Sequence, residues 1–173
     1  MRWNLSWRAD PRARALADRH YSRQKPGAPQ FVPPGRCIVL VTPGADAYWV
    51  TSWPFAKYVR HAWAGAWVCS AFRNEGAHLS SELIRDACAA TRYFYGDPPP
   101  LGMVSFVDTA KVRKKRDFGR CYLRAGFEVV GWTAGGLLAL QLRPAVFPSA
   151  SPPTAAQLSL GNWGAGGTVN GPA

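Results

Sequence analysis

The chain has 173 residues, 47% of them hydrophobic, which suits one domain with a buried core and excludes disorder throughout. Its 21 lysines and arginines outnumber its 10 aspartates and glutamates, and the resulting charge of +11 predicts a polyanionic partner. No segment approaches the roughly 20 apolar residues that cross a bilayer, and the first residues lack the apolar stretch of a signal peptide. We therefore expect a cytoplasmic protein without a membrane partner.

The amino-terminal half predicts one helix followed by three strands. Asp10 before Pro11 is typical of a capped helix start, and the helix is expected to run to about His20. A loop rich in proline and glycine covers residues 25–35. Strands are then predicted over residues 37–42, 48–53 and 67–72, with an irregular segment over 54–65.

The carboxyl-terminal half begins with the clearest helix of the chain. Ser80 is the expected cap, apolar residues recur at helical spacing from Leu83 to Phe94, and Gly96 with the prolines after it ends the helix. A buried strand is predicted over 103–107 and a short helix over 118–125. Two strands over 128–133 and 137–143 are expected to form a hairpin.

This order of elements predicts a single mixed α/β domain of the α+β kind. The strands over 67–72 and 103–107 are joined by a helix, so they should form a right-handed unit and lie parallel. The remaining pairs should be antiparallel, giving a mostly antiparallel sheet with one parallel, splayed pair and flanking helices. Residues 144–173 carry no charge and are rich in proline, glycine and alanine, so we expect a domain over 1–143 and a flexible tail.

Four cysteines, at positions 37, 69, 88 and 121, stand far apart without a Cys-x-x-Cys pair. This spacing argues against a zinc finger or ribbon. Each cysteine lies within an apolar segment, so the simplest interpretation is that they are small buried hydrophobic residues.

Ligands gather at the carboxyl ends of parallel strands, and two segments of this sequence occupy that position. Arg73 and Gly76 precede the long helix, where backbone N–H groups and a guanidinium can hold phosphate, although an ordinary strand-to-helix turn fits as well. Ser105 lies in the strand over 103–107 and Asp108 follows it. That carboxylate can act as a general base or metal ligand, or merely cap the turn at residues 109–110.

Basic residues are concentrated after Asp108, and the resulting loop is predicted to bind anions such as coenzyme phosphates or the DNA backbone; they are Lys111, Arg113, Lys114, Lys115 and Arg116. Residues 53–63 interleave aromatic rings with Lys57 and Arg60, a mixture that suits stacking on exposed bases. The alternative for that segment is a half-buried aromatic loop.

The strand, helix, strand order followed by Arg120 to Phe127 resembles the core of the GNAT superfamily of N-acetyltransferases. In that superfamily a tyrosine four residues before a Gly-Phe pair faces the sulfur of coenzyme A and serves as a general acid. Tyr122 holds that place before Gly126 and Phe127. The resemblance implies a GNAT fold and acetyl-CoA or a related acyl donor. The loop from Arg73 to Gly76 departs from the superfamily, since it lacks the usual second glycine or alanine.

A narrower set of matches resembles the phage Mom family, which adds a carbamoylmethyl-type group to adenine in DNA and thereby masks restriction sites. The matching segments begin at His20-Tyr21-Ser22-Arg23, Arg73, Ser105 and Tyr122, and the resemblance covers about residues 14–133. It implies functional roles for His20, Tyr21 and Asp108, with iron(II) bound by these three residues as one option. Arg23 is expected to contact DNA.

The combined expectation is a DNA-modifying acyltransferase whose substrate is double-stranded DNA. Asp108 or His20 would deprotonate or orient an exocyclic base nitrogen, and Tyr122 would protonate the leaving group. Arg73, Gly76, Ser105, Lys111 and Arg113 would bind the acyl donor. Two alternatives stay open: an N-acetyltransferase acting on a protein amine or small molecule, and a non-catalytic DNA-binding protein. The oligomeric state is open as well, with a homodimer as one option.

Overall fold

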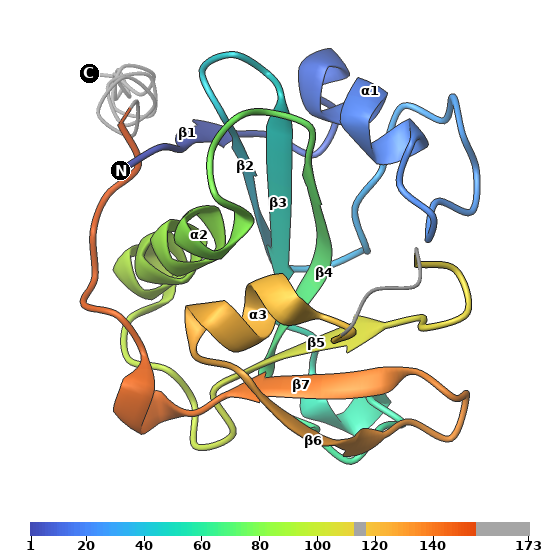
Figure 1. Cartoon of the computed structure of the whole chain (residues 1–173), viewed down its shortest axis with the longest axis vertical. Coiled ribbons are helices and arrows are strands. Elements are labelled where there is room, and N and C mark those ends of the chain that lie inside the picture. The colour runs from blue at the N-terminus through green and yellow to red at the C-terminus, as the bar shows by residue number, and fades with distance from the viewer. Residues whose placement is uncertain (113–116, 155–173) are drawn as a thin grey trace, which may run out of the picture.

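The computed structural model describes residues 1–112 and 117–154. A seven-stranded sheet in the order β1-β2-β3-β4-β5-β7-β6 forms the centre of the described structure. Figure 1 shows β2, β3 and β4 side by side in one half, and β5, β7 and β6 in the other. All neighbouring pairs are antiparallel except β4 and β5. The predicted mixed α/β class, the mostly antiparallel sheet and the parallel pair are confirmed.

Six of the seven strands coincide with the predicted ones to within two residues. They are β2 (Cys37–Val41), β3 (Ala47–Ser52), β4 (Trp67–Asn74), β5 (Met103–Val107), β6 (Glu128–Trp132) and β7 (Leu138–Leu142). The sequence did not predict β1 (Asn4–Ser6), which pairs with β2 at the edge of the sheet. Three residues are too few for an apolar alternation to stand out.

The ends of the helices follow from capping residues that lie close to them in the sequence. α1 (Pro11–Asp18) is capped by the Asp10 side chain, which accepts a hydrogen bond from the Arg12 backbone N–H. α2 (Ser80–Tyr95) ends at Gly96, whose positive φ of 83° favours glycine. Ser80, the expected cap, is instead the first helical residue of α2, and Leu79 precedes it. α3 (Arg120–Ala125) is shorter than predicted, and single turns lie at η1 (Ala56–Tyr58) and η2 (Pro144–Val146).

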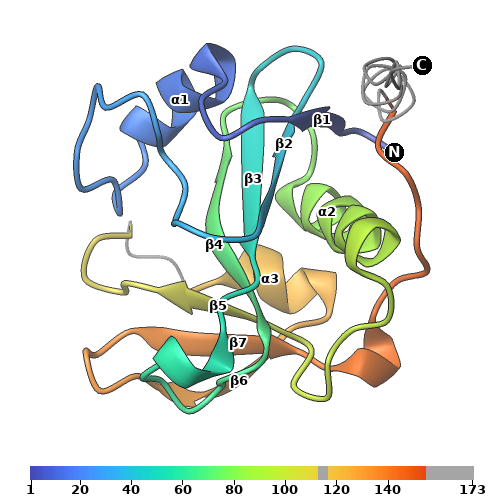
Figure 2. The ribbon, with the colours of Figure 1, turned by 180° about the vertical axis from the view of Figure 1, so that it is seen from behind.

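The strands bury both faces of the sheet, because alternate side chains point to opposite sides. In β2 and β3, Leu40 and Trp49 belong to the core beneath α2, whereas Val41 and Val50 belong to the core beneath α1. Figures 1 and 2, seen from opposite sides, show α2 and α3 on one face and α1 with the loop after it on the other. The sheet is therefore the middle of three layers.

The parallel pair separates at its carboxyl end. Pairing between β4 and β5 runs from Trp67 opposite Met103 to Cys69 opposite Ser105 and goes no further. β4 nevertheless continues to Asn74 beside β3, and β5 continues to Val107 beside β7. Figure 1 shows the two strands pointing in different directions. This divergence opens a gap between two strand edges, with α3 beside it.

Packed residues continue past Arg143, where the sequence predicted the domain to end. Phe147 is only 7% exposed and its ring lies 5.5 Å from that of Trp67. Ser151 donates a backbone hydrogen bond to Ala89, and Thr154 donates one to Trp3 at 2.8 Å. An uncharged segment rich in proline can thus be ordered when it carries one large core residue and finds backbone partners. The rest of the predicted tail, residues 155–173, lies outside the described residues.

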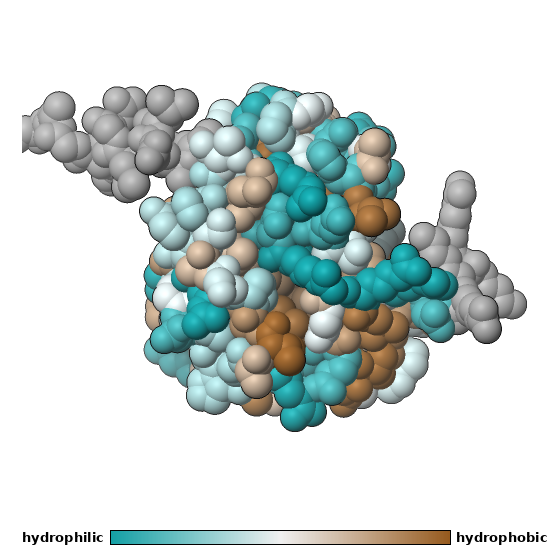
Figure 3. Space-filling model, turned by 60° about the vertical axis from the view of Figure 1, so that its left-hand side comes forward, coloured by the Kyte–Doolittle hydropathy of each residue, from teal (hydrophilic) through white to brown (hydrophobic). Residues whose placement is uncertain are grey.

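The surface mixes polar and apolar areas. Figure 3 shows hydrophilic residues as a band across the middle of one face, with hydrophobic residues gathered beside it. Large hydrophobic side chains are exposed at Phe55, Tyr58 and Trp132, which are 74%, 72% and 58% exposed. Among the described residues, no helix is long and apolar enough to cross a membrane.

Candidate active site

A cavity of about 550 Å³ lies where β4 and β5 separate. Its walls come from the turn after α1, the outer half of β4, the end of β5 and the start of α3. Side chains able to carry chemistry or binding line it, namely His20, Tyr21, Cys69, Arg73, Ser105 and Tyr122. Five of these six residues, all except Cys69, were predicted from the sequence as catalytic or cofactor-binding. The volume is within the range of about 300–1,000 Å³ usual for small-molecule sites.

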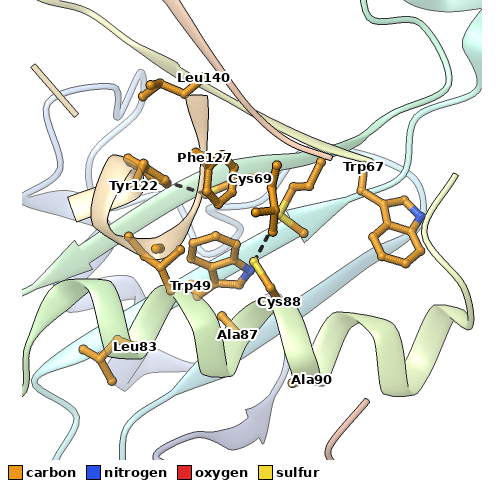
Figure 4. Close-up of a cluster of buried hydrophobic side chains, with 14 of the residues drawn as sticks. Trp49, Trp67, Cys69, Leu83, Ala87, Cys88, Ala90, Tyr122, Phe127 and Leu140 are labelled. Carbon is orange, nitrogen blue, oxygen red and sulfur yellow. Dashed lines mark hydrogen bonds between the residues drawn. The ribbon is translucent and has the colours of Figure 1, made fainter. Parts of the chain in front are cut away.

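Three polar side chains meet at the last pair of the parallel strands. The Tyr122 hydroxyl lies 3.4 Å from the Cys69 Sγ, and Figure 4 shows the tyrosine directed toward this cysteine. Ser105, opposite Cys69 in the register, forms side-chain hydrogen bonds with both. Burial raises the pKa of Cys69 to about 12 and holds the pKa of Tyr122 well above its usual value. At neutral pH both groups therefore keep their protons.

The position of Tyr122 is fixed by the short helix α3. Its backbone N–H donates to the Gly119 carbonyl, and its own carbonyl accepts from the Phe127 N–H. Its ring packs edge-on against Phe127 at 5.3 Å and against Phe72 of β4 at 6.3 Å. The phenol thus belongs to a rigid part of the core, with its hydroxyl at the cavity.

His20 and Tyr21 lie on the turn that follows α1 and form part of the cavity wall. Their rings are stacked with centroids 4.5 Å apart. Burial, with the nearby charge of Arg73, lowers the pKa of His20 to about 4, so the imidazole is neutral at physiological pH. Its Nδ1 lies 2.7 Å from the Ser22 hydroxyl oxygen and accepts from the Ser22 backbone N–H at 3.2 Å. The ring is therefore held in place but is a weak base.

Arg73 lines the cavity from β4, and two of its guanidinium nitrogens donate hydrogen bonds within the molecule. Its Nε donates to Glu75 at 2.5 Å, and its Nη1 donates to the Arg19 carbonyl at 2.7 Å. Glu75 also accepts two hydrogen bonds from the Arg19 guanidinium, and these donors lower its pKa to about 2. The network ties the end of α1 to the loop between β4 and α2.

Gly76 lies outside the residues that line the cavity. A Cβ at this position would overlap with the carboxylate of Asp46. Its N–H donates to the Asn74 side chain at 2.9 Å. The structure thus gives the glycine a packing reason, close approach to the β2–β3 turn, which is independent of the predicted phosphate contact.

Asp108 stands at the end of β5 but is not among the residues lining the cavity. Its carboxylate accepts from the Ala110 N–H at 3.1 Å, the turn cap that the sequence offered as the alternative. Lys111 pairs with the same carboxylate at 3.6 Å and is likewise outside the lining. Asp108 contacts a residue of the cavity wall through its backbone, because its N–H donates a hydrogen bond to the Tyr21 hydroxyl at 3.4 Å.

These positions do not suit the suggested iron site. The Nδ1 of His20 faces Ser22, and the Asp108 carboxylate is turned toward its own loop. Among the described residues, no group of three or more histidine, cysteine, aspartate or glutamate side chains is placed to hold a metal ion.

The residues expected to contact DNA are in three different situations. The Arg23 side chain is 10% exposed and donates to Asp18, Ala28 and Gln30, so it braces the loop after α1. Lys57 and Arg60 are exposed beside the aromatic rings of the segment over 54–65, with the Lys57 Nζ 4.9 Å from the Tyr58 ring centre. Arg113, predicted for the donor, and Lys114, Lys115 and Arg116, predicted for DNA, lie outside the described residues.

Two residues of the site were not predicted. Cys69 is fully within the core, as expected of a buried hydrophobic residue, but its sulfur also contacts the Tyr122 hydroxyl. Phe72 lines the cavity and orients Tyr122. Both lie in the predicted strand over 67–72, but no local pattern in the sequence reveals that β4 and β5 separate after Cys69 and leave these side chains beside Tyr122.

Comparison with known proteins gives no family for this chain. No family model, no curated protein and no solved structure matches it.

Proposed function

We propose that the protein is a GNAT-type acyltransferase that modifies an exocyclic amino group of a DNA base, adenine above all, which is the base that the Mom family modifies. The observation that carries the proposal is the divergence of β4 and β5 with the Tyr122 hydroxyl at its apex. Protection of phage DNA from restriction is the role that this activity would serve.

The gap between the strands suits an extended donor such as acetyl-CoA. Beyond Cys69 the edge of β4 that faces β5 is not paired with that strand, so its backbone groups can bind an amide-bearing chain as an added strand would. Asn74 and Ser80 line the outer end of the same cavity. The donor supplies an activated acyl group, and the chain supplies its position.

Tyr122 has the properties of a general acid for this transfer. Attack of the base nitrogen on the thioester carbonyl forms a C–N bond and breaks the C–S bond. The departing thiolate takes the Tyr122 proton, and the proton lost by the nitrogen restores the phenol through solvent. Burial holds the pKa of Tyr122 well above its usual value, so the proton is present before the reaction, but the phenol is a weaker acid than a free tyrosine.

The acceptor is inferred from charge and from exposed aromatic residues. The net charge of +11 favours the DNA backbone. The rings of Phe55 and Tyr58 are exposed, with the Lys57 ammonium group over the Tyr58 ring, a combination that suits contact with nucleic acid away from the reacting base. His20, neutral and fixed by Ser22, would orient the base nitrogen rather than remove its proton.

The test is to express the full chain in bacteria and to examine the nucleosides of their DNA by mass spectrometry. A modified deoxynucleoside, absent from cells that carry the empty vector, is the expected result. An unchanged nucleoside profile from cells containing folded protein would contradict the proposal. Acylated protein lysines with unmodified DNA would instead favour the protein-amine alternative.

A further inference from the structure

A second cavity of about 490 Å³ lies on the α1 face of the sheet. The loop after α1 forms its outer wall and β3 forms its floor. Flat or amide-bearing side chains line it, among them Gln24, Gln30, Phe31, Pro33 and Tyr48. Arg23 holds this loop in place through its hydrogen bonds to the Ala28 and Gln30 carbonyls.

The two cavities adjoin. His20, Ser22, Ser70 and Ala71 line both of them, so these four residues form the common wall. A group bound in the second cavity would therefore meet the first cavity at His20. Two molecules bound in the two cavities would therefore lie on either side of His20.

Tyr48 marks the second cavity as a binding site. The residue is 1% exposed, with its ring edge-on to Phe31 and His20 at 6.0 and 6.4 Å. Its hydroxyl has no hydrogen-bond partner among the described residues. Tyr48 itself is among the residues that line the second cavity. A buried hydroxyl normally has a hydrogen-bond partner, and a molecule bound in this cavity would supply one.

The charges of the lining distinguish between classes of acceptor. None of the residues lining the second cavity is a carboxylate, and its one ionic side chain, Arg23, is cationic and paired with Asp18. A lysine ammonium group would find repulsion there without a counter-charge. A neutral planar ring with hydrogen-bonding edges would find aromatic walls, two primary amides and the Tyr48 hydroxyl.

From this geometry we propose that the second cavity is the acceptor subsite and that it binds a purine base. This inference rests on the proposed function. The base would present its exocyclic nitrogen, past His20, to the acyl donor bound in the first cavity. Tyr48 contributes a hydrogen bond to the base and is a specificity residue.

Side-chain and backbone NMR spectra of the isotope-labelled full chain test the subsite. Deoxyadenosine is titrated in one experiment, coenzyme A in a second and lysine methyl ester in a third. Deoxyadenosine should shift the Gln24 and Gln30 side-chain amide signals. Coenzyme A should shift signals of the first cavity, such as the backbone of Gly119 and Arg120. Lysine methyl ester should shift neither set.

Tyr48→Phe is the informative variant, because it keeps the ring and removes a hydroxyl to which no group in residues 1–112 and 117–154 is hydrogen-bonded. It should weaken deoxyadenosine binding about tenfold while leaving thermal stability unchanged or higher. A purely structural role for Tyr48 predicts no change in affinity. Lys25→Ala, on the same loop but outside the lining, is the matched control and should bind as the original chain does.

The outcomes separate the two proposals. Deoxyadenosine that leaves Gln24 and Gln30 unshifted, or that binds Tyr48→Phe with full affinity, overturns the subsite even if DNA is modified in cells. Shifts at the second cavity with an unmodified nucleoside profile support the subsite and contradict the proposed function. Binding of lysine methyl ester in place of deoxyadenosine overturns the purine assignment.

Discussion

Tyr122 joins two roles in one side chain, since its ring is core and its hydroxyl is at the cavity. The ring packs against Phe72 and Phe127, and the oxygen contacts the Cys69 sulfur at 3.4 Å. A substitution that removes only the hydroxyl oxygen therefore tests the catalytic role of Tyr122 while keeping the packing of its ring. Few residues of the site allow so clean a division, because Arg73 and His20 each support neighbouring backbone.

Tyr122→Phe is expected to lower the rate of DNA modification by about 10²- to 10⁴-fold, as for loss of a general acid. The unfolding free energy should fall by about 1–2 kcal/mol, because the ring contacts remain but buried Cys69 and Ser105 lose a hydrogen-bond partner. Nucleoside mass spectrometry over time gives the rate, and urea unfolding gives the stability. Tyr93→Phe, on the exposed side of α2, is the control. A Tyr122→Phe variant with full activity would show that another group protonates the leaving thiolate.

At the scale of elements, α1 is fastened to the β4–α2 loop by one ionic network. Glu75 accepts hydrogen bonds from both Arg19 and Arg73, and their donation lowers its pKa from 4.5 to about 2. A carboxyl group whose pKa is lower in the folded state stabilises the fold above its unfolded pKa. This contribution decreases as the pH falls from about 4.5 and is lost below about 2.

Glu75→Gln should accordingly lower the melting temperature at pH 7, and the difference from the original chain should shrink as the pH approaches 2. Calorimetry across that range measures both chains. Asp97→Asn provides the comparison. The Asp97 side chain is 88% exposed, so its ion pair with Arg92 should contribute little to the melting temperature at any pH. A constant difference between the Glu75→Gln variant and the original chain at all pH values would argue against the network.

Local sequence patterns predicted most of the helices and strands. The features that the sequence did not predict depend on contacts between residues far apart in the chain. The Asp10 cap, the apolar repeat from Leu83 to Phe94 and Gly96 each act within a few residues, so α1 and α2 were found. The site depends on where β4 and β5 separate, and that follows from the pairing of each strand with a different neighbour. For this reason the sequence could not show that the Tyr48 hydroxyl has no hydrogen-bond partner among the described residues, or that Asp108 lies outside the lining of the first cavity.

At the scale of the whole molecule, core packing continues to Phe147, beyond the last charged residue. Phe147→Ala should lower the unfolding free energy by about 3–5 kcal/mol, because it leaves a cavity beside Trp67. Val146→Ala, at a side chain that is 60% exposed, should change it by less than about 0.5 kcal/mol. Urea unfolding followed by tryptophan fluorescence compares the two. Equal unfolding free energies for the Phe147→Ala and Val146→Ala variants would support a domain that ends at Arg143.

The segment that carries Phe147 also brings distant parts of the chain together. Thr154 donates its backbone N–H to the Trp3 carbonyl and its hydroxyl to the Met1 carbonyl at 3.1 Å. The described domain thus begins and finishes at one place on its surface, as Figure 1 shows near the start of β1. Such closeness makes the fold a candidate for circular permutation, with a short peptide joining these residues and new termini in the turn between β2 and β3.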